Sequence, residues 1–122
     1  MGGDAERPVV ARGAARIVEY ARAANGSYPA KEFVDSRPAR DQRRLAVLFQ
    51  RLADTGKINN REQFKRLSGK IWEFKRGQIR VACFQVKDRW RLTNGVIKKS
   101  DKWKKSDIER ARRIMTEDLD RK

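Results

Sequence analysis

The sequence predicts a single α+β domain with antiparallel strand pairing in a meander and helices packed on the sheet. Residues 71–97 hold three short stretches in which apolar and polar side chains alternate, as they do in successive strands. Apolar residues at helical spacing occur before residue 56 and again after residue 105. The 122 residues suffice for one modest core. We therefore expect the order strand, two helices, three-strand meander, helix.

The N-terminal part is expected to contribute a leader and the first strand. Residues 1–15 lack sustained periodicity, so we expect a flexible leader there and place the domain at residues 16–122. The stretch ARIVEYARA then alternates between two faces and predicts a strand.

Two helices are expected next. The stretch NGSYPAKEFVDS predicts a turn and a short helix, with Ser27 as its cap and Pro29 in its first turn. A longer helix is expected from about Pro38 to Thr55, and Gly56 is the residue type that ends a helix. Its apolar stripe comprises Leu45, Leu48, Phe49 and Leu52.

The second half is expected to form the meander and the last helix. A polar connection with a helical turn at Glu62–Leu67 precedes the strands IWEF, QIRVACFQV and WRLTNGVI. The pair Asn94-Gly95 indicates either a hairpin turn or a bulge, and the short apolar runs around it fit a bulge equally well. Ser106, with Glu109 three residues later, has the spacing of a capping box and predicts a helix start.

The net charge of +15 is the strongest compositional feature. The first 60 residues hold 11 basic against 7 acidic side chains, and the remainder hold 20 against 9, so the excess is concentrated in the second half. A one-sided basic excess favours a polyanion, most often nucleic acid, as the partner. A solubilising surface is the alternative interpretation.

Composition also excludes several kinds of chemistry. The chain has no histidine, which rules out an imidazole base, a Ser-His or Cys-His pair and a histidine-containing zinc site. The single Cys83 cannot form an internal disulfide, and its apolar neighbours indicate a buried filler. We expect no metal and no cofactor. No long apolar run suggests a signal peptide or membrane span, so we expect a cytosolic protein without a membrane partner.

The alternation of the strands assigns a candidate site to one face of the sheet. If the more apolar side of each strand packs on the helices, Glu73, Lys75 and Arg80 look away from the core. Only a tight turn separates Lys75 from Arg80, and the third strand ends at Lys98 and Lys99. These side chains would together form a cationic concavity.

Such a surface suits RNA binding and RNA cleavage without a metal. Lysine and arginine neutralise phosphates, and an aromatic side chain such as Trp103 can stack on an unpaired base. In cleavage, the ribose 2′-hydroxyl attacks its own phosphate, which requires a base, cations for the developing charge and an acid. A lysine crowded by other cations is one candidate base, because its charged form is disfavoured. Glu73 is the other candidate. We predict that RNA is bound by Arg76, Lys102, Trp103, Lys104 and Lys105.

Each of these residues also has a simpler interpretation. Lys75 and Arg76 could be polar turn residues, and Arg80 could serve only to pair with Glu73. The lysines from 98 to 105 could belong to a solvated loop. Trp103 could fold back as a hydrophobic cover instead of stacking on a base.

Three stretches of the chain resemble a known protein family. AKEFVDS, LADTGKINNREQFKRLSGKIWEFKRGQIRVACF and GVIKKSDKWKKSDIERARRI are similar to the HigB-like, phage-derived branch of the RelE/ParE toxin superfamily. The resemblance covers about residues 16–117 and implies a RelE-like fold. By position it implies that Arg80 contacts phosphate, that Lys75 is the basic residue before the hairpin, and that Lys98 and Lys99, with Lys102 nearby, close the site.

The resemblance also implies a function and partners. Members are toxins of type II toxin–antitoxin pairs, and RelE and HigB relatives cut messenger RNA on the ribosome by metal-free transesterification. We therefore expect an mRNA interferase, neutralised by an antitoxin of the helix-turn-helix type. A ParE-like toxin that targets DNA gyrase and a non-catalytic RNA-binding protein remain alternatives.

Overall fold

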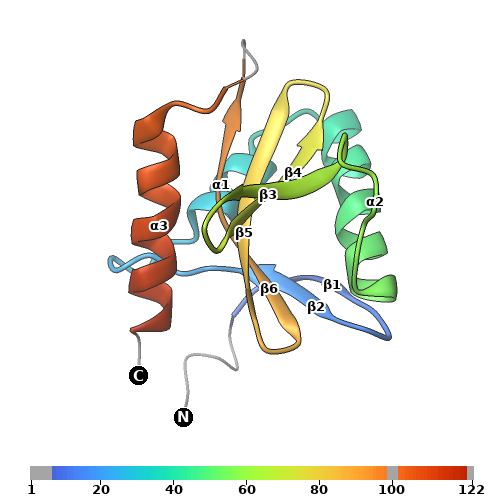
Figure 1. Ribbon diagram of the computed structural model, residues 1–122, viewed down its shortest axis with the longest axis horizontal. Coiled ribbons are helices and arrows are strands. Elements are labelled where there is room, and N and C mark those ends of the chain that lie inside the picture. The colour runs from blue at the N-terminus through green and yellow to red at the C-terminus, as the bar shows by residue number, and fades with distance from the viewer. Residues whose placement is uncertain (1–6, 99–101, 121–122) are drawn as a thin grey trace.

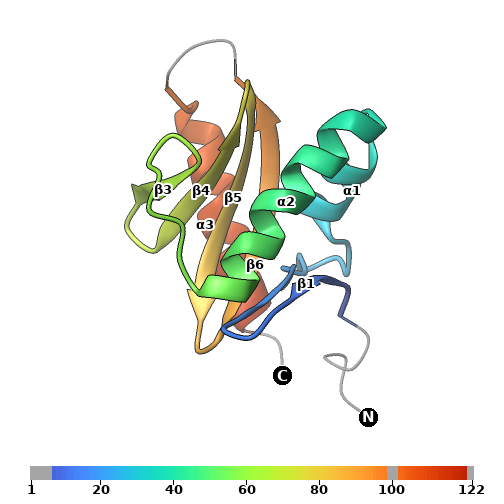
Figure 2. The ribbon, with the colours of Figure 1, turned by 90° about the vertical axis from the view of Figure 1, so that its right-hand side faces the viewer.

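The protein has three layers, with a mixed sheet between two sets of helices. The computed structural model describes residues 7–98 and 102–120. Helices α1 (Pro29–Asp35) and α2 (Ala39–Thr55) lie on one face of the sheet, and α3 (Lys105–Leu119) lies on the other (Figure 1). The view turned by 90° shows the same arrangement from the side of α2 (Figure 2). The predicted α+β class is confirmed, but the sheet is larger than expected.

Six strands form one sheet in the order β1-β2-β6-β5-β4-β3. Their bounds are β1 Val9–Arg12, β2 Ile17–Tyr20, β3 Phe64–Ser68, β4 Ile71–Arg76, β5 Ile79–Val86 and β6 Arg89–Ile97. The pairing of β2 with β6 is parallel, and the other pairings are antiparallel. A parallel pair needs a long crossover, which α1, α2 and the first strands of the meander provide.

Two strands correct the sequence-based description. Residues 1–15 were predicted to be a leader, but β1 lies within that segment and pairs with β2. A helical turn was predicted at Glu62–Leu67, where β3 instead extends the meander to four strands. Both are short edge strands, and the charged side chains of Lys65 and Arg66 on β3 are typical of a strand edge that faces solvent. Such strands carry little hydrophobic periodicity, so alternation alone did not reveal them.

The helix boundaries agree with those predicted from the sequence, except at two N-caps. Helix α2 ends where Gly56 takes the left-handed conformation, with φ of 83°. The predicted caps Ser27 and Ser106 are wrong, because the N-cap positions belong to Tyr28 and Lys104, and neither side chain makes a capping hydrogen bond. Pro29 opens α1, as expected from its fixed φ and missing N–H.

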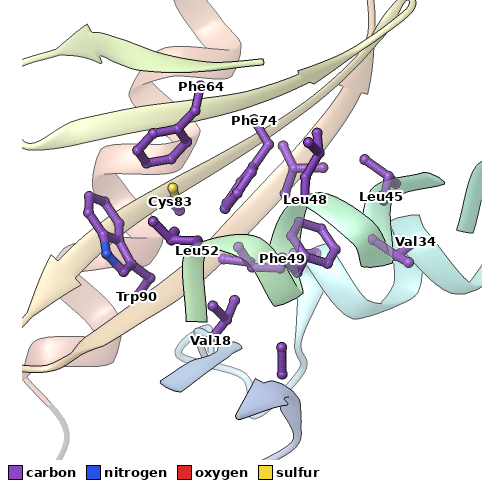
Figure 3. Close-up of a cluster of buried hydrophobic side chains, with 14 of the residues drawn as sticks. Val18, Val34, Leu45, Leu48, Phe49, Leu52, Phe64, Phe74, Cys83 and Trp90 are labelled. Carbon is purple, nitrogen blue, oxygen red and sulfur yellow. The ribbon is translucent and has the colours of Figure 1, made fainter. Parts of the chain in front are cut away.

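A separate hydrophobic core lies on each face of the sheet. The larger one packs α2 on the strands, and the ring of Phe49 meets that of Phe74 edge to face at 4.9 Å (Figure 3). The smaller one packs α3 on the sheet through Phe84 and Ile114, which are both 1% exposed. Burying a side chain of this size contributes about 1.5–3 kcal/mol. The face that carries the candidate site is therefore largely covered by α3 instead of being open.

A network of buried ion pairs fastens the C-terminal end of α3. Glu19 on β2 accepts hydrogen bonds from Arg89 at 2.8 Å and from Arg91 at 2.7 Å. Asp118 on α3 accepts from Arg91 at 2.7 Å and from Arg7 at 2.6 Å. Both carboxylates are almost completely buried, so their arginine partners compensate for the lost hydration.

The described helices include none that is both long and apolar enough to cross a membrane.

The predicted irregularity near Asn94-Gly95 is a bulge and not a hairpin turn. The register between β5 and β6 shifts at Ala82 and Cys83, next to Asn94 on β6. Gly95 leaves room for α1, because a Cβ at this position would overlap the ring of Phe33. The bulge and the glycine together let α1 lie closely on β6 (Figure 1).

Replacing Gly95 should therefore disturb the packing of α1 on β6. We expect Gly95→Ala to lower the free energy of unfolding by about 1–3 kcal/mol, because the added methyl group overpacks against Phe33. Urea unfolding followed by circular dichroism measures the change. In a Phe33→Ala background the same substitution should cost much less. An equal cost in both backgrounds would show that the ring is not the obstacle.

Candidate functional site

The turn between β4 and β5 brings two of the predicted cations face to face. Lys75 on β4 is the cross-strand partner of Arg80 on β5. Both side chains alternate onto the α3 face of the sheet, together with Glu73. The predicted proximity of these three residues is confirmed.

Arg80 is held in a fixed position by the protein. Its Nη1 donates hydrogen bonds to the backbone oxygens of Gly77, at 2.6 Å, and Ile79, at 3.0 Å. Its Nε lies 3.6 Å from Oε1 of Glu73, and the side chain is 14% exposed. The guanidinium is consequently oriented before any ligand arrives, which lowers the entropic cost of binding an anion.

Glu73 is buried, which corrects the expectation that it faces away from the core. It is 2% exposed, and its Oε1 accepts a hydrogen bond from the indole Nε1 of Trp103 at 2.9 Å. A carboxylate enclosed in this way cannot reach a ribose hydroxyl on the surface. Its contacts instead position Arg80 and Trp103.

Trp103 is the hydrophobic cover and not an exposed stacking platform. It is 8% exposed and belongs to the smaller core, where its neighbours include Ala82, Phe84 and Ala111. The ring lies below the surface because its N–H finds a buried acceptor, as a buried tryptophan requires. The prediction that it stacks on an RNA base is therefore wrong.

Lys98, the residue that follows β6, lies at the same corner of the sheet. Its backbone N–H donates to the carbonyl oxygen of Gln78 at 2.7 Å, which places it beside the β4–β5 turn. Its residue exposure is only 9%. The predicted catalytic residue Lys99 lies outside the described residues.

A pocket of about 280 Å³ lies between the end of β6 and the start of α3. Its lining includes Lys98, Lys102, Lys104, Asp107 and Trp103. Trp103 thus connects this pocket to Glu73 and, through Glu73, to Arg80. The resulting cationic corner comprises Lys75, Arg80, Lys98, Lys102 and Lys104.

The predicted RNA-binding residues lie in different places on the protein and do not form one continuous site. Lys102 and Lys104 are exposed and line the pocket, and Lys105 is exposed on the first turn of α3. Arg76 lies on a different groove, on the α2 side of the sheet. Asp107 also lines the pocket from the first turn of α3, and no local sequence pattern marks it.

Cys83, a buried titratable residue of β5, has an unreactive thiol. Burial, together with the charge of Glu73, raises the pKa of the Cys83 thiol well above its usual range. The thiol therefore stays protonated and acts as a small apolar side chain. Among the described residues, no three His, Cys, Asp or Glu side chains are grouped so that they could hold a metal ion.

Comparison with known protein families shows to which family the chain belongs. Residues 32–116, more than half of its length, match the family described as Phage derived protein Gp49-like (DUF891). The chain belongs to this Gp49-like family. The family is a RelE/HigB-type toxin family, associated with toxins of toxin–antitoxin systems, and the match spans both β4–β5 and the start of α3. No curated protein matches the chain in sequence.

The hydrogen bond between Trp103 and Glu73 should contribute measurably to the stability of this Gp49-like protein. Trp103→Phe removes the indole donor from a buried carboxylate, so we expect a loss of about 1–3 kcal/mol beyond the loss of packing. Trp90→Phe is a matched control, because the buried Nε1 of Trp90 has no hydrogen-bond partner among the described residues.

Urea unfolding of both variants gives the comparison. In a Glu73→Met background, which lacks the carboxylate, the extra cost of Trp103→Phe should largely disappear. If Trp103→Phe and Trp90→Phe cost the same in the wild-type background, the hydrogen bond contributes nothing to the attachment of α3.

Proposed function

We propose that this protein is the toxin of a type II toxin–antitoxin pair and acts as an endoribonuclease on messenger RNA at the ribosome. An antitoxin of the helix-turn-helix type would neutralise it. Membership of the Gp49-like family supports the toxin role. The pre-oriented Arg80, opposite Lys75 and close to the pocket of Lys98, is the observation that carries the nuclease role.

The proposed cleavage uses only side chains of this protein and the RNA itself. Lys75 is the proposed general base that accepts the proton of a ribose 2′-hydroxyl, and the oxygen attacks the adjacent phosphorus. The bond from phosphorus to the 5′-oxygen breaks, and the ammonium group of Lys98 protonates that oxygen. The products are a 2′,3′-cyclic phosphate and a 5′-hydroxyl end.

Arg80 stabilises the charge that develops on the phosphorane oxygens. A guanidinium remains protonated throughout. Because Nη1 donates to backbone oxygens and Nε is buried beside Glu73, Nη2 is the nitrogen that would donate to the phosphate. A cation whose position is already fixed is most effective there, because it needs no reorganisation as the charge forms. Lys99, which follows Lys98 directly, is proposed to add a further positive charge.

Glu73 acts in this proposal as a positioning residue. It holds the Nε side of Arg80, and it holds Trp103 beneath the pocket. The orientation of the guanidinium and the position of Trp103 therefore depend on one buried carboxylate.

Removing the proposed proton-transfer groups should abolish cleavage without unfolding the protein. We expect Lys75→Met and Lys98→Met each to reduce the rate by about 100-fold or more. Arg80→Gln, which keeps hydrogen-bond donors but loses the charge, should do the same. Lys70→Met, on the exposed β3–β4 turn, is the control and should cleave normally.

The measurement is mapping of new 5′-hydroxyl ends on messenger RNA after induction, with circular dichroism to verify folding. Growth arrest should be relieved in parallel with the loss of cleavage. Wild-type protein that arrests growth through DNA damage with intact transcripts would favour a gyrase-targeting toxin instead. Ribosome binding without any cut transcript would favour a non-catalytic RNA-binding protein.

A further inference from the structure

A second cationic groove lies on the other side of the β4–β5 turn from Arg80. It has a volume of about 400 Å³, and its walls come from the start of α2, the β4–β5 turn and the end of β6. The residues that define it are Arg37, Arg44, Arg76, Asp41, Ile79 and Ile97. We call it the arginine groove.

The charges of the arginine groove favour an anionic ligand. Three arginines from two separate parts of the chain converge on it, and Asp41 is the acidic side chain among its described lining residues. Three guanidinium groups around one hollow repel each other, and an anion between them would relieve that repulsion. Guanidinium groups also match the geometry of phosphate oxygens.

Arg37 is already held in place at this groove. Its Cζ lies 4.8 Å from the ring centroid of Phe33, and its Nη2 donates to the hydroxyl of Ser36 at 3.3 Å. The side-chain amide of Gln42 fixes the same turn by donating to the carbonyl oxygen of Arg37 at 2.8 Å. Within the described part of the chain, the buried Nε of Arg37 has no hydrogen-bond acceptor. Because that Nε is buried, a ligand in the groove would meet the Nη groups, whose position is set by the contacts with Phe33 and Ser36.

The arginine groove is continuous with the candidate site through one residue. Ile97 lines this groove and also lines the pocket of Lys98 and Trp103. It is 42% exposed, which is unusual for a large apolar side chain at the end of a central strand. A ligand that crossed Ile97 would pass from one cationic hollow to the other, with apolar contact at the crossing.

We propose that the arginine groove binds phosphates of the RNA that flank the cleaved bond, with a ribose or base of the same strand against Ile97. The inference rests on the proposed nuclease function and extends it, because it assigns a path to the uncleaved part of the substrate. Single-stranded RNA combines regularly spaced phosphates with apolar ring faces, and the groove offers a partner for each. The contacts would be independent of base sequence, because arginine would meet only the backbone.

Binding of single-stranded RNA of two lengths tests the arginine groove. The probes are a labelled tetranucleotide and a labelled dodecanucleotide, both with 2′-O-methyl riboses so that neither can be cleaved. The double variant Arg37→Gln/Arg44→Gln should bind the dodecanucleotide roughly tenfold more weakly than wild type, because two phosphate contacts are lost. Its affinity for the tetranucleotide, which spans only the candidate site, should stay within twofold of wild type.

Salt dependence gives a second readout of the same contacts. The slope of log affinity against log salt for the dodecanucleotide should fall by about 1.4 in the double variant, since each lost contact with a single strand contributes about 0.7. Arg40→Gln/Arg43→Gln is the matched control, because these exposed arginines of α2 do not line the groove. Asp41→Asn should tighten dodecanucleotide binding, because it removes a negative charge from the groove.

Two results would overturn the assignment of the arginine groove. One is a double variant with wild-type affinity and salt slope for the dodecanucleotide, which is also the result expected if the groove docks an acidic protein segment. The other is an equal loss in the matched control, which would mean that only overall charge matters. Failure of the nuclease proposal would give a different result. RNA would still bind through the arginine groove, but cells expressing Lys75→Met or Lys98→Met would show the same pattern of transcript ends as cells expressing the wild-type protein.

Discussion

The carboxylate of Glu73 is the contact on which the candidate site depends. It is buried between the sheet and α3, and it pairs at once with Arg80 and with the indole of Trp103. A buried charge is costly unless its partners are placed well, so the three groups restrict one another to a single arrangement. That arrangement orients a guanidinium next to the β4–β5 turn and holds Trp103 at the pocket beside the end of β6. Glu73, predicted from the sequence to be catalytic, is instead a buried residue that positions Arg80 and Trp103.

Buried carboxylates also hold the C-terminal end of α3 against the sheet. Glu19 and Asp118 are buried among arginines where the helix meets β2 and β6, and apolar packing lies between the two polar contacts. In a chain with a net charge of +15, these few internal carboxylates neutralise arginines that support the fold. The other cations can remain on the surface, where water screens their repulsion and a polyanion can bind them.

The β4–β5 turn separates two cationic hollows, the pocket of Lys98 and the arginine groove. Lys75 and Arg80 face α3, whereas Arg76 faces the start of α2, because neighbouring residues on a strand point to opposite sides of the sheet. Ile97 lies between the hollows and remains exposed. In the proposed function, one hollow would cleave the RNA and the other would position the same strand.

The sequence alone determined what depends on neighbours along the chain. Periodicity identified the α2 stripe, the faces of β4 and β5 and the proximity of Lys75 to Arg80, because residues joined by a tight turn must lie close together. It did not reveal the edge strands β1 and β3, whose few apolar residues leave little pattern. The tertiary structure decided which face α3 covers, and hence that Glu73 and Trp103 are buried partners. It also decided that Arg37 and Arg44 lie beside Arg76, since no local rule relates residues brought together by packing between separate elements.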